Sequence, residues 1–120
     1  MSSIENKKQK EQMIMRIVVK QPDNMPEVRE VENELHVFQD IVGGYIQCVN
    51  VVDNIICVCN EEGKLIGLNP NFIFNNDMIV GSVFFCAVKD DDFDSLTDEQ
   101  VKIIMSAMSV FETKVNKKLQ

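Results

Sequence analysis

Cysteine is the residue type in this 120-residue sequence with the widest chemistry, because a thiol can act as a nucleophile or a metal ligand. The four cysteines, Cys48, Cys57, Cys59 and Cys86, lie within apolar segments, whereas structural zinc sites usually place paired cysteines on turns. Cys57 and Cys59 would share one face of a strand and could meet Cys48 or Cys86 across a sheet. We predict that all four are small, buried, apolar residues that bind no metal.

The other residues with catalytic potential lack the partners that catalysis requires. His36 is the only histidine, and it lies away from the apolar face of a predicted helix, so we expect it to be exposed and unsuited as a general base. The acidic run at 90–94 lacks the central glycine of an EF-hand loop and contains Phe93. No phosphate-binding G-x-G-x-x-G or Walker motif is present. We therefore predict that the protein is not an enzyme and has no catalytic residue and no cofactor.

Three polar, turn-forming segments between apolar strands, at 43–45, 60–64 and 69–71, are the most promising binding features. Glycine-containing loops can present backbone N–H groups to an anionic ligand, an exposed tyrosine can stack on a base, and a lysine can pair with a phosphate. Asparagine side chains could recognise the polar edges of the same ligand. The candidate ligand-binding residues are Gly43, Gly44, Tyr45, Asn60, Lys64 and Asn71. The alternative is that all three segments are ordinary turns.

The elements that would position these residues follow from apolar periodicity and turn signals. Strands are predicted at 13–20, 27–31, 45–52, 55–59, 64–68 and 78–88, the last with a bulge or bend at Gly81. The second strand is charged, which is typical of a sheet edge, and the fourth is apolar on both faces, which indicates a central position. Loops are expected around 69–71, 75–77 and 89–94.

Two helices complete the predicted fold. A short helix follows the second strand, with Asn33 as its N-cap, and ends at Gly43-Gly44. A long C-terminal helix begins at Thr97, which forms a capping box with Gln100. Its second apolar face, at Ile103 and Val110, indicates either further packing or a subunit contact.

The sequence therefore predicts an α+β fold with a mainly antiparallel sheet of about five to six strands, one short helix after strand 2 and one long C-terminal helix. We expect a single domain at 13–120, preceded by a disordered polar tail at 1–12. No apolar run reaches the roughly 18–20 residues of a membrane span, and the N-terminal residues lack the apolar core of a secretory signal. These features predict a cytoplasmic protein with no membrane contact.

Charge is unevenly distributed along the chain. The net charge is −7, but residues 21–101 hold 16 acidic and only three basic residues, so this stretch carries −13. Such a body repels the phosphates of nucleic acids, and we expect no nucleic-acid partner. The acidity either competes with DNA for a basic partner or only keeps the protein soluble.

Five short motifs in fixed order resemble a small domain of unknown function found in phages, plasmids and other mobile elements. They are Val-Gly-Gly-Tyr-Ile at 42–46, Asn-Glu-Glu-Gly-Lys at 60–64, Leu-x-Pro-Asn at 68–71, Ile-Val-Gly at 79–81 and Ser-Leu-Thr-Asp-Glu-Gln at 95–100. The resemblance extends from about Met13 to Phe111. It implies an α+β fold and a mobile-element setting, and it supplies no activity.

Together, the resemblance and the polar turns predict a non-enzymatic accessory protein that acts against host defence. The leading hypothesis is that it binds and sequesters a nucleotide-like small-molecule signal through the six candidate residues. The alternative is a protein–protein inhibitor of a host defence protein that acts through an acidic, DNA-decoy-like surface. A homo-oligomer formed through the C-terminal helix is compatible with both.

Overall fold

The computed structural model describes residues 14–119, with side chains described as far as residue 110. Met13 and the predicted tail at 1–12 lie outside the described residues. The elements in chain order are β1 (Ile14–Lys20), β2 (Glu27–Glu32), α2 (Leu35–Val42), β3 (Ile46–Val52), β4 (Ile55–Asn60), β5 (Pro70–Phe74), β6 (Asp77–Val80), β7 (Val83–Lys89), β8 (Asp92–Asp94) and α3 (Asp98–Leu119).

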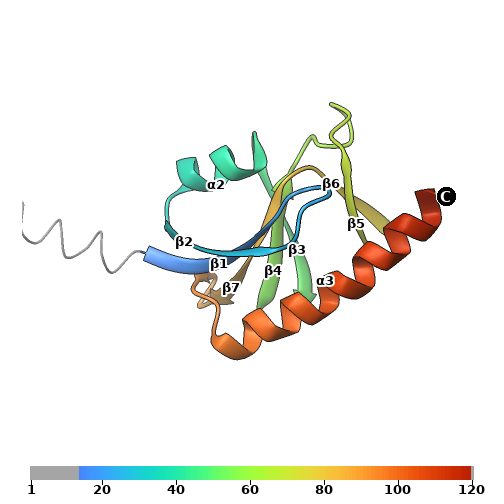
Figure 1. Ribbon diagram of the computed structural model, residues 1–120. Coiled ribbons are helices and arrows are strands. Elements are labelled where there is room, and N and C mark those ends of the chain that lie inside the picture. Colours follow the sequence, from blue (N-terminus) through green and yellow to red (C-terminus); the bar gives the residue numbers. More distant parts are fainter. Residues whose placement is uncertain (1–13, 120) are drawn as a thin grey trace, which may run out of the picture.

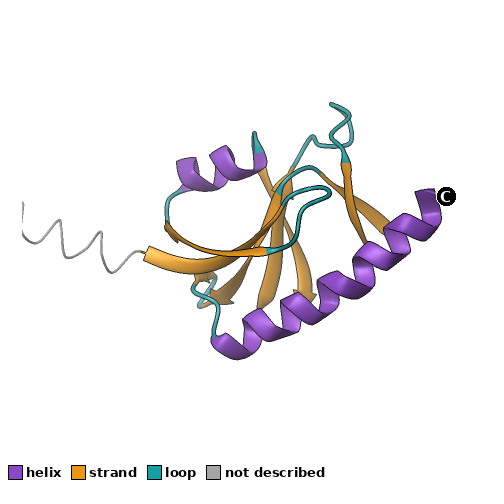
Figure 2. Cartoon of the chain, viewed as in Figure 1, coloured by secondary structure: helices purple, strands orange, loops and turns teal. Residues whose placement is uncertain are grey.

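A six-stranded antiparallel sheet forms the middle of the molecule (Figure 1, Figure 2). Five strands follow the order β2-β1-β7-β4-β3, and the short β8 pairs with β7. Helix α2 covers one face, while α3 and the separate β5–β6 hairpin cover the other (Figure 1). The predicted fold class is confirmed, including the charged edge strand β2 and the central strand β4.

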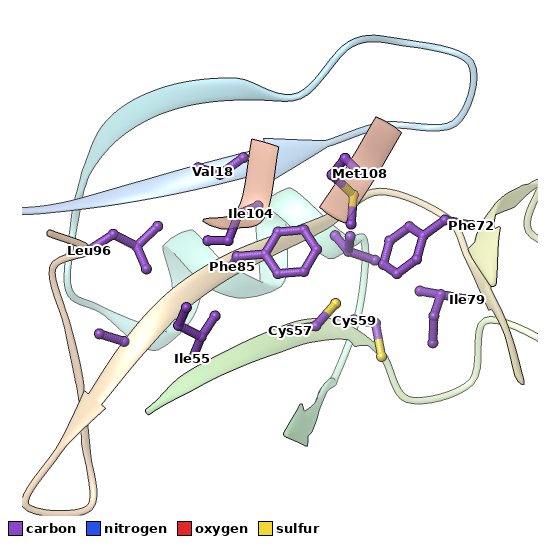
Figure 3. Close-up of a cluster of buried hydrophobic side chains, with 12 residues drawn as sticks. Val18, Ile55, Cys57, Cys59, Phe72, Ile79, Phe85, Leu96, Ile104 and Met108 are labelled. Atoms are coloured by element: carbon purple, nitrogen blue, oxygen red, sulfur yellow. The ribbon is translucent and has the colours of Figure 1, made fainter. Parts of the chain in front are cut away.

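Each face of the sheet buries its own apolar cluster. Met15, Ile17 and Val19 of β1 face α2, whereas Val18 between them faces α3. The six residues of β4 are all buried because both faces are covered. On the α3 side, Phe85 packs against Phe72 of the hairpin, with ring centroids 5.9 Å apart (Figure 3). The hairpin therefore shares one buried cluster with the helix beside it.

The predicted helix ends are confirmed at two of three positions. Gly43 adopts the left-handed conformation that terminates α2, with φ of 79°. At the start of α3, the Gln100 N–H donates to Thr97 Oγ1 (3.1 Å) and the Thr97 N–H donates to Gln100 Oε1 (2.9 Å). The prediction for Asn33 is wrong, because Glu34 is the N-cap of α2 and Asn33 Nδ2 donates instead to the Phe93 carbonyl (2.9 Å).

The predicted strand at 64–68 is also wrong, since the segment is a series of tight turns. The Ile66, Gly67 and Leu68 N–H groups donate to carbonyls three to five residues earlier, and Gly67 has a φ of 74°. A strand instead forms at β5, where a loop was expected, and pairs with β6 through a turn at Asn75-Asn76. The acidic loop at 89–94 is a hairpin, with left-handed Asp90 and Asp91 between β7 and β8.

Candidate functional site

A surface hollow of about 510 Å³ lies where α2 ends, β3 begins and β4 runs into the turn at 61–67. Its lining residues are Gln39, Asp40, Gly43, Gly44, Tyr45, Asn60, Glu62 and Ile66. Four of the six predicted ligand-binding residues, Gly43, Gly44, Tyr45 and Asn60, are therefore brought together. Its volume is in the range of small-molecule and side-chain binding sites. We treat this hollow as the candidate site.

The two glycines build the wall of the hollow and do not offer free donors. The N–H groups of Gly43 and Gly44 both donate to the Gln39 carbonyl, at 2.8 and 3.1 Å, as the end of α2 requires. A Cβ on Gly44 would lie 2.9 Å from Asn60 Nδ2, so the chain needs glycine there for close packing. The N–H groups that were predicted to bind an anion are therefore already engaged within the chain, and the ligand-binding role of these glycines stays a prediction.

Asn60 fastens the helix end to the strand end and is itself buried. Its Nδ2 donates to the Val42 carbonyl (3.1 Å), and its Oδ1 accepts from the Glu62 N–H (2.8 Å). Both ends of the side-chain amide thus serve the fold, because they fix α2 and the turn after β4 relative to each other. Asn60 shapes the hollow and is not positioned to recognise a ligand edge.

Lys64 and Asn71, the other two predicted residues, lie outside the hollow. Lys64 pairs with Asp77 at the start of β6. Asn71 is buried in β5, where its Nδ2 donates to the Lys20 carbonyl (2.8 Å) and the Gly81 carbonyl (2.7 Å). Its Oδ1 accepts a hydrogen bond from Lys20 Nζ (3.0 Å). Asn71 therefore joins the hairpin to the end of β1.

The hollow has an acidic character. Asp40 and Glu62 line it, and none of the described residues that line it is basic. The C-terminal end of α2, where Gly43 caps the helix, also points its partial negative charge toward this region. A phosphate would be repelled there, whereas an ammonium or guanidinium group would be attracted.

Apolar side chains stand exposed beside these carboxylates. Tyr45 is 67% exposed, and Leu65 and Ile66 are 87% and 57% exposed. A contiguous exposed apolar patch rimmed by polar residues is typical of protein-interaction sites. Asp40, Glu62 and Ile66 were not predicted, because the candidate residues were those suited to binding a phosphate-bearing ligand. The signal that could have found Glu62 and Ile66 is the acidic Glu61-Glu62 pair, which only two residues separate from Leu65-Ile66.

A protein-family model matches most of this chain. The family model for Domain of unknown function (DUF3846) matches residues 15–109, which include every residue that lines the hollow. The chain belongs to this family. No curated protein and no solved structure matches the chain. The predicted resemblance to a domain of unknown function is therefore confirmed, while its mobile-element setting stays a prediction.

The cysteines of this DUF3846 domain occupy both faces of the sheet. Cys57 and Cys59 face α3, Cys86 faces α2, and Cys48 is exposed on β3. Burial raises the pKa of all four thiols, to about 12 for Cys86 and well above the ordinary value for Cys57. A thiol nucleophile or metal ligand requires the opposite shift. The expectation of burial holds for three and is wrong for Cys48, which lies on an edge strand.

The remaining candidates for catalysis or metal binding are His36 and the acidic side chains. His36 is exposed as predicted, and its Nδ1 lies 3.2 Å from Glu34 Oε2. Across the described part of the chain, no group of three or more His, Cys, Asp or Glu side chains is arranged to hold a metal ion. Between residues 14 and 119, no helix is long and apolar enough to cross a membrane.

Proposed function

We propose that this protein is a binding protein that engages a basic partner protein through the hollow beside Tyr45. The observation that carries the proposal is the combination of two carboxylates, Asp40 and Glu62, with exposed Tyr45 and Ile66 around one concave surface. A partner lysine or arginine would lie near the carboxylates and the end of α2. An adjacent apolar side chain of the partner would cover Tyr45 and Ile66. Tyrosine anchors bordered by a polar rim are typical of interaction hot spots.

The acidity of the whole chain supports the same partner chemistry. Residues 21–101 carry −13, which accelerates encounter with a basic protein and disfavours nucleic acids. If the partner is a DNA-binding defence protein, occupation of its basic surface would inhibit it, which is the counter-defence role hypothesised from the sequence. The proposal requires neither catalytic residue nor cofactor.

Sequestration of a nucleotide-like signal is the second candidate. The hollow's volume of about 510 Å³ and the exposed Tyr45 favour it, because a nucleobase could stack on the phenol ring. The carboxylates oppose it, as do the engaged Gly43 and Gly44 N–H groups and the pairing of Lys64 with Asp77. We rank it second for these reasons.

The proposal can be tested by panning a displayed library of random dodecapeptides against the purified protein. We expect enrichment of peptides that combine lysine or arginine with an aromatic or aliphatic residue. Tyr45→Ala should weaken binding of the enriched peptides by roughly 30-fold, as expected for a central aromatic anchor. Glu62→Lys should weaken it by roughly tenfold or more, because attraction becomes repulsion.

Asp92→Lys is the matched control, since it makes the same charge change at the other end of the sheet. Asp92 pairs with Lys89 at the end of β7, and β7 runs beside β4 so that this end neighbours Ile55 and not Asn60. Binding by Asp92→Lys should stay within about twofold of the unmodified protein. Enrichment of acidic peptides, or peptide binding that Tyr45→Ala leaves unchanged, would refute the proposal. Calorimetric titration with cyclic nucleotides and ADP-ribose derivatives tests the second candidate separately.

A further inference from the structure

The two edges of the sheet differ sharply in charge. The edge strand β2 carries four charged residues, Glu27, Arg29, Glu30 and Glu32, which is a common protection against pairing with another strand. The opposite edge strand, β3, has the sequence IQCVNVV and carries none. Within residues 14–119, no strand pairs with the outer side of β3. The β3 edge therefore lacks the charged side chains that protect the β2 edge from pairing with another strand.

The hydrogen-bond pattern identifies which groups of β3 point outward. The Glu61 N–H donates to the Tyr45 carbonyl (2.8 Å), so Tyr45 and Glu61 form a hydrogen-bonded pair. Such pairs alternate along an antiparallel ladder, and the register Gln47–Cys59 and Val49–Cys57 continues this set. The backbone groups of Gln47 and Val49 therefore face β4. Those of Ile46, Cys48 and Asn50 face away from the sheet.

An apolar part of α3 lies next to this open edge. A hollow of about 170 Å³ separates the end of β3 from the helix. Its lining residues are Val51, Val52, Ile55, Phe74, Phe85, Ile103, Ile104, Ala107 and Met108. Ile103 and Val52 are each 43% exposed, and Val110, about two turns further along α3, is 54% exposed. The open strand edge thus lies beside an exposed apolar part of α3.

We propose that two copies of this chain pair edge to edge through β3, antiparallel and centred on Cys48. In this register Cys48 lies opposite Cys48 of the second copy, and Ile46 lies opposite Asn50. These are the residues whose N–H and carbonyl groups face outward, so each of the three pairs exchanges two hydrogen bonds. The register uses the straight part of β3 and ends before its irregularity between Asn50 and Val52.

A second copy fits this edge better than a different strand-bearing protein. Antiparallel pairing of one strand with itself is isologous, so the same uncharged edge meets itself about a two-fold axis perpendicular to the sheet. That axis places both α3 helices on the same face, where their exposed Ile103 and Val110 side chains can cover the junction. For an acidic chain of net charge −7, an uncharged edge is where a second copy can approach with least repulsion.

Cys48 provides a direct test because it is exposed while the other three cysteines are buried. A short bis-maleimide added to the native, unmodified protein should join two chains through Cys48, since opposed residues in such a pair have Cα atoms about 5.5 Å apart. Cys48→Ser should abolish the cross-link and keep the dimer. Sedimentation equilibrium should give twice the 13.7 kDa of one chain for both proteins.

Cys48→Lys separates this dimer from dimers formed through other surfaces. It places two ammonium groups opposite each other and should return the protein to the mass of one chain, with an unchanged far-ultraviolet circular dichroism spectrum. A native chain that sediments as a monomer at every concentration would refute the proposal. So would a dimer that survives Cys48→Lys and gives no Cys48 cross-link. The hollow beside Tyr45 is built from one chain, so failure here leaves the proposed function untouched.

Discussion

At the residue scale, the most informative side chains are two buried asparagines. Asn60 and Asn71 were predicted as ligand contacts because asparagine in a polar turn is typical of both binding and folding roles. The structure places both amides against backbone carbonyls and leaves them with partners at each end. Residue type alone could not separate the two roles, because the difference depends on which carbonyls the fold brings near each amide.

Replacing Asn71 with alanine should destabilise the fold. The change removes two donated hydrogen bonds and one accepted hydrogen bond, all to buried atoms near the junction of β1, β5 and Gly81. We expect the free energy of unfolding to fall by about 2–4 kcal/mol in urea denaturation. The control is Asn54→Ala in the exposed turn between β3 and β4, which should change stability by less than about 0.5 kcal/mol. Equal effects of the two changes would contradict this role for Asn71.

Because burial raises the pKa values of the buried thiols, we expect the fold to lose stability at alkaline pH. Burial raises the pKa of Cys86 from 9.0 to about 12, so between these values the unfolded chain loses a proton that the folded chain retains. The free energy of unfolding should therefore decline as pH rises above about 9, with this thiol contributing at most about 1.4 kcal/mol per pH unit. Below pH 9 the contribution is fully present. The measurement is urea denaturation at a series of pH values.

Cys86→Ala is the variant that isolates this effect. It should be less stable than the unmodified protein at pH 7, because it leaves a cavity on the α2 side of the sheet. Its stability should nevertheless decline less steeply between pH 9 and pH 11. Parallel curves for the two proteins would show that Cys86 ionises as readily in the folded as in the unfolded chain.

At the element scale, apolar periodicity and local turn or capping residues predicted several elements correctly. The strands β1, β3 and β4 and the capping box of α3 follow from alternation and local hydrogen-bonding residues. The strand prediction at 64–68 was wrong because Leu65 and Ile66 are apolar but exposed. Their apolar character is typical of a strand, although the segment forms turns and joins neither sheet. The β5–β6 hairpin was missed because Asn71 was assigned to a loop, whereas it lies within β5 and its amide donates to the Lys20 and Gly81 carbonyls.

Two glycines in these turns provide a matched pair. Gly67 and Gly81 have similar left-handed φ values of 74° and 77°, so alanine is strained to a similar degree at either position. A Cβ at Gly67 would meet open space, whereas a Cβ at Gly81 would lie 2.6 Å from Leu68 Cδ1. Gly81→Ala should therefore cost about 1 kcal/mol or more beyond Gly67→Ala in thermal or urea unfolding. A larger loss for Gly67→Ala would contradict the placement of Leu68 over the β6–β7 junction.

At the scale of the whole molecule, charge organises the proposed function. The sequence correctly identifies an acidic body, but it does not reveal that Asp40 and Glu62 are gathered around Tyr45. This gathering requires the left-handed turn at Gly43, the close packing of Gly44 on Asn60, and the turn that follows β4. Half of the candidate site was therefore predictable from turn residues, and its sign of charge became clear only from the assembled fold.

Association with an enriched basic peptide should depend strongly on salt. Long-range attraction by a body of −13 raises the association rate, and salt screens charges separated by more than about 10 Å at 0.1 M. We expect the association rate constant to fall at least severalfold between about 0.02 and 0.5 M salt. The dissociation rate constant should change less, because Tyr45 and Ile66 hold the complex through apolar contact. Stopped-flow fluorescence with a labelled peptide measures both, and salt-independent association would contradict electrostatic steering.

The central claim is that the hollow beside Tyr45 accepts a cationic and not an anionic partner. The most direct measurement is a pair of NMR titrations of the ¹⁵N-labelled protein, one with the peptide amide Arg-Leu-Arg and one with ADP-ribose. We predict that the peptide shifts the backbone amide signals of residues 43–45 and 61–66, whereas ADP-ribose leaves them in place. Shifts of these signals by ADP-ribose alone would contradict the account and support nucleotide sequestration instead.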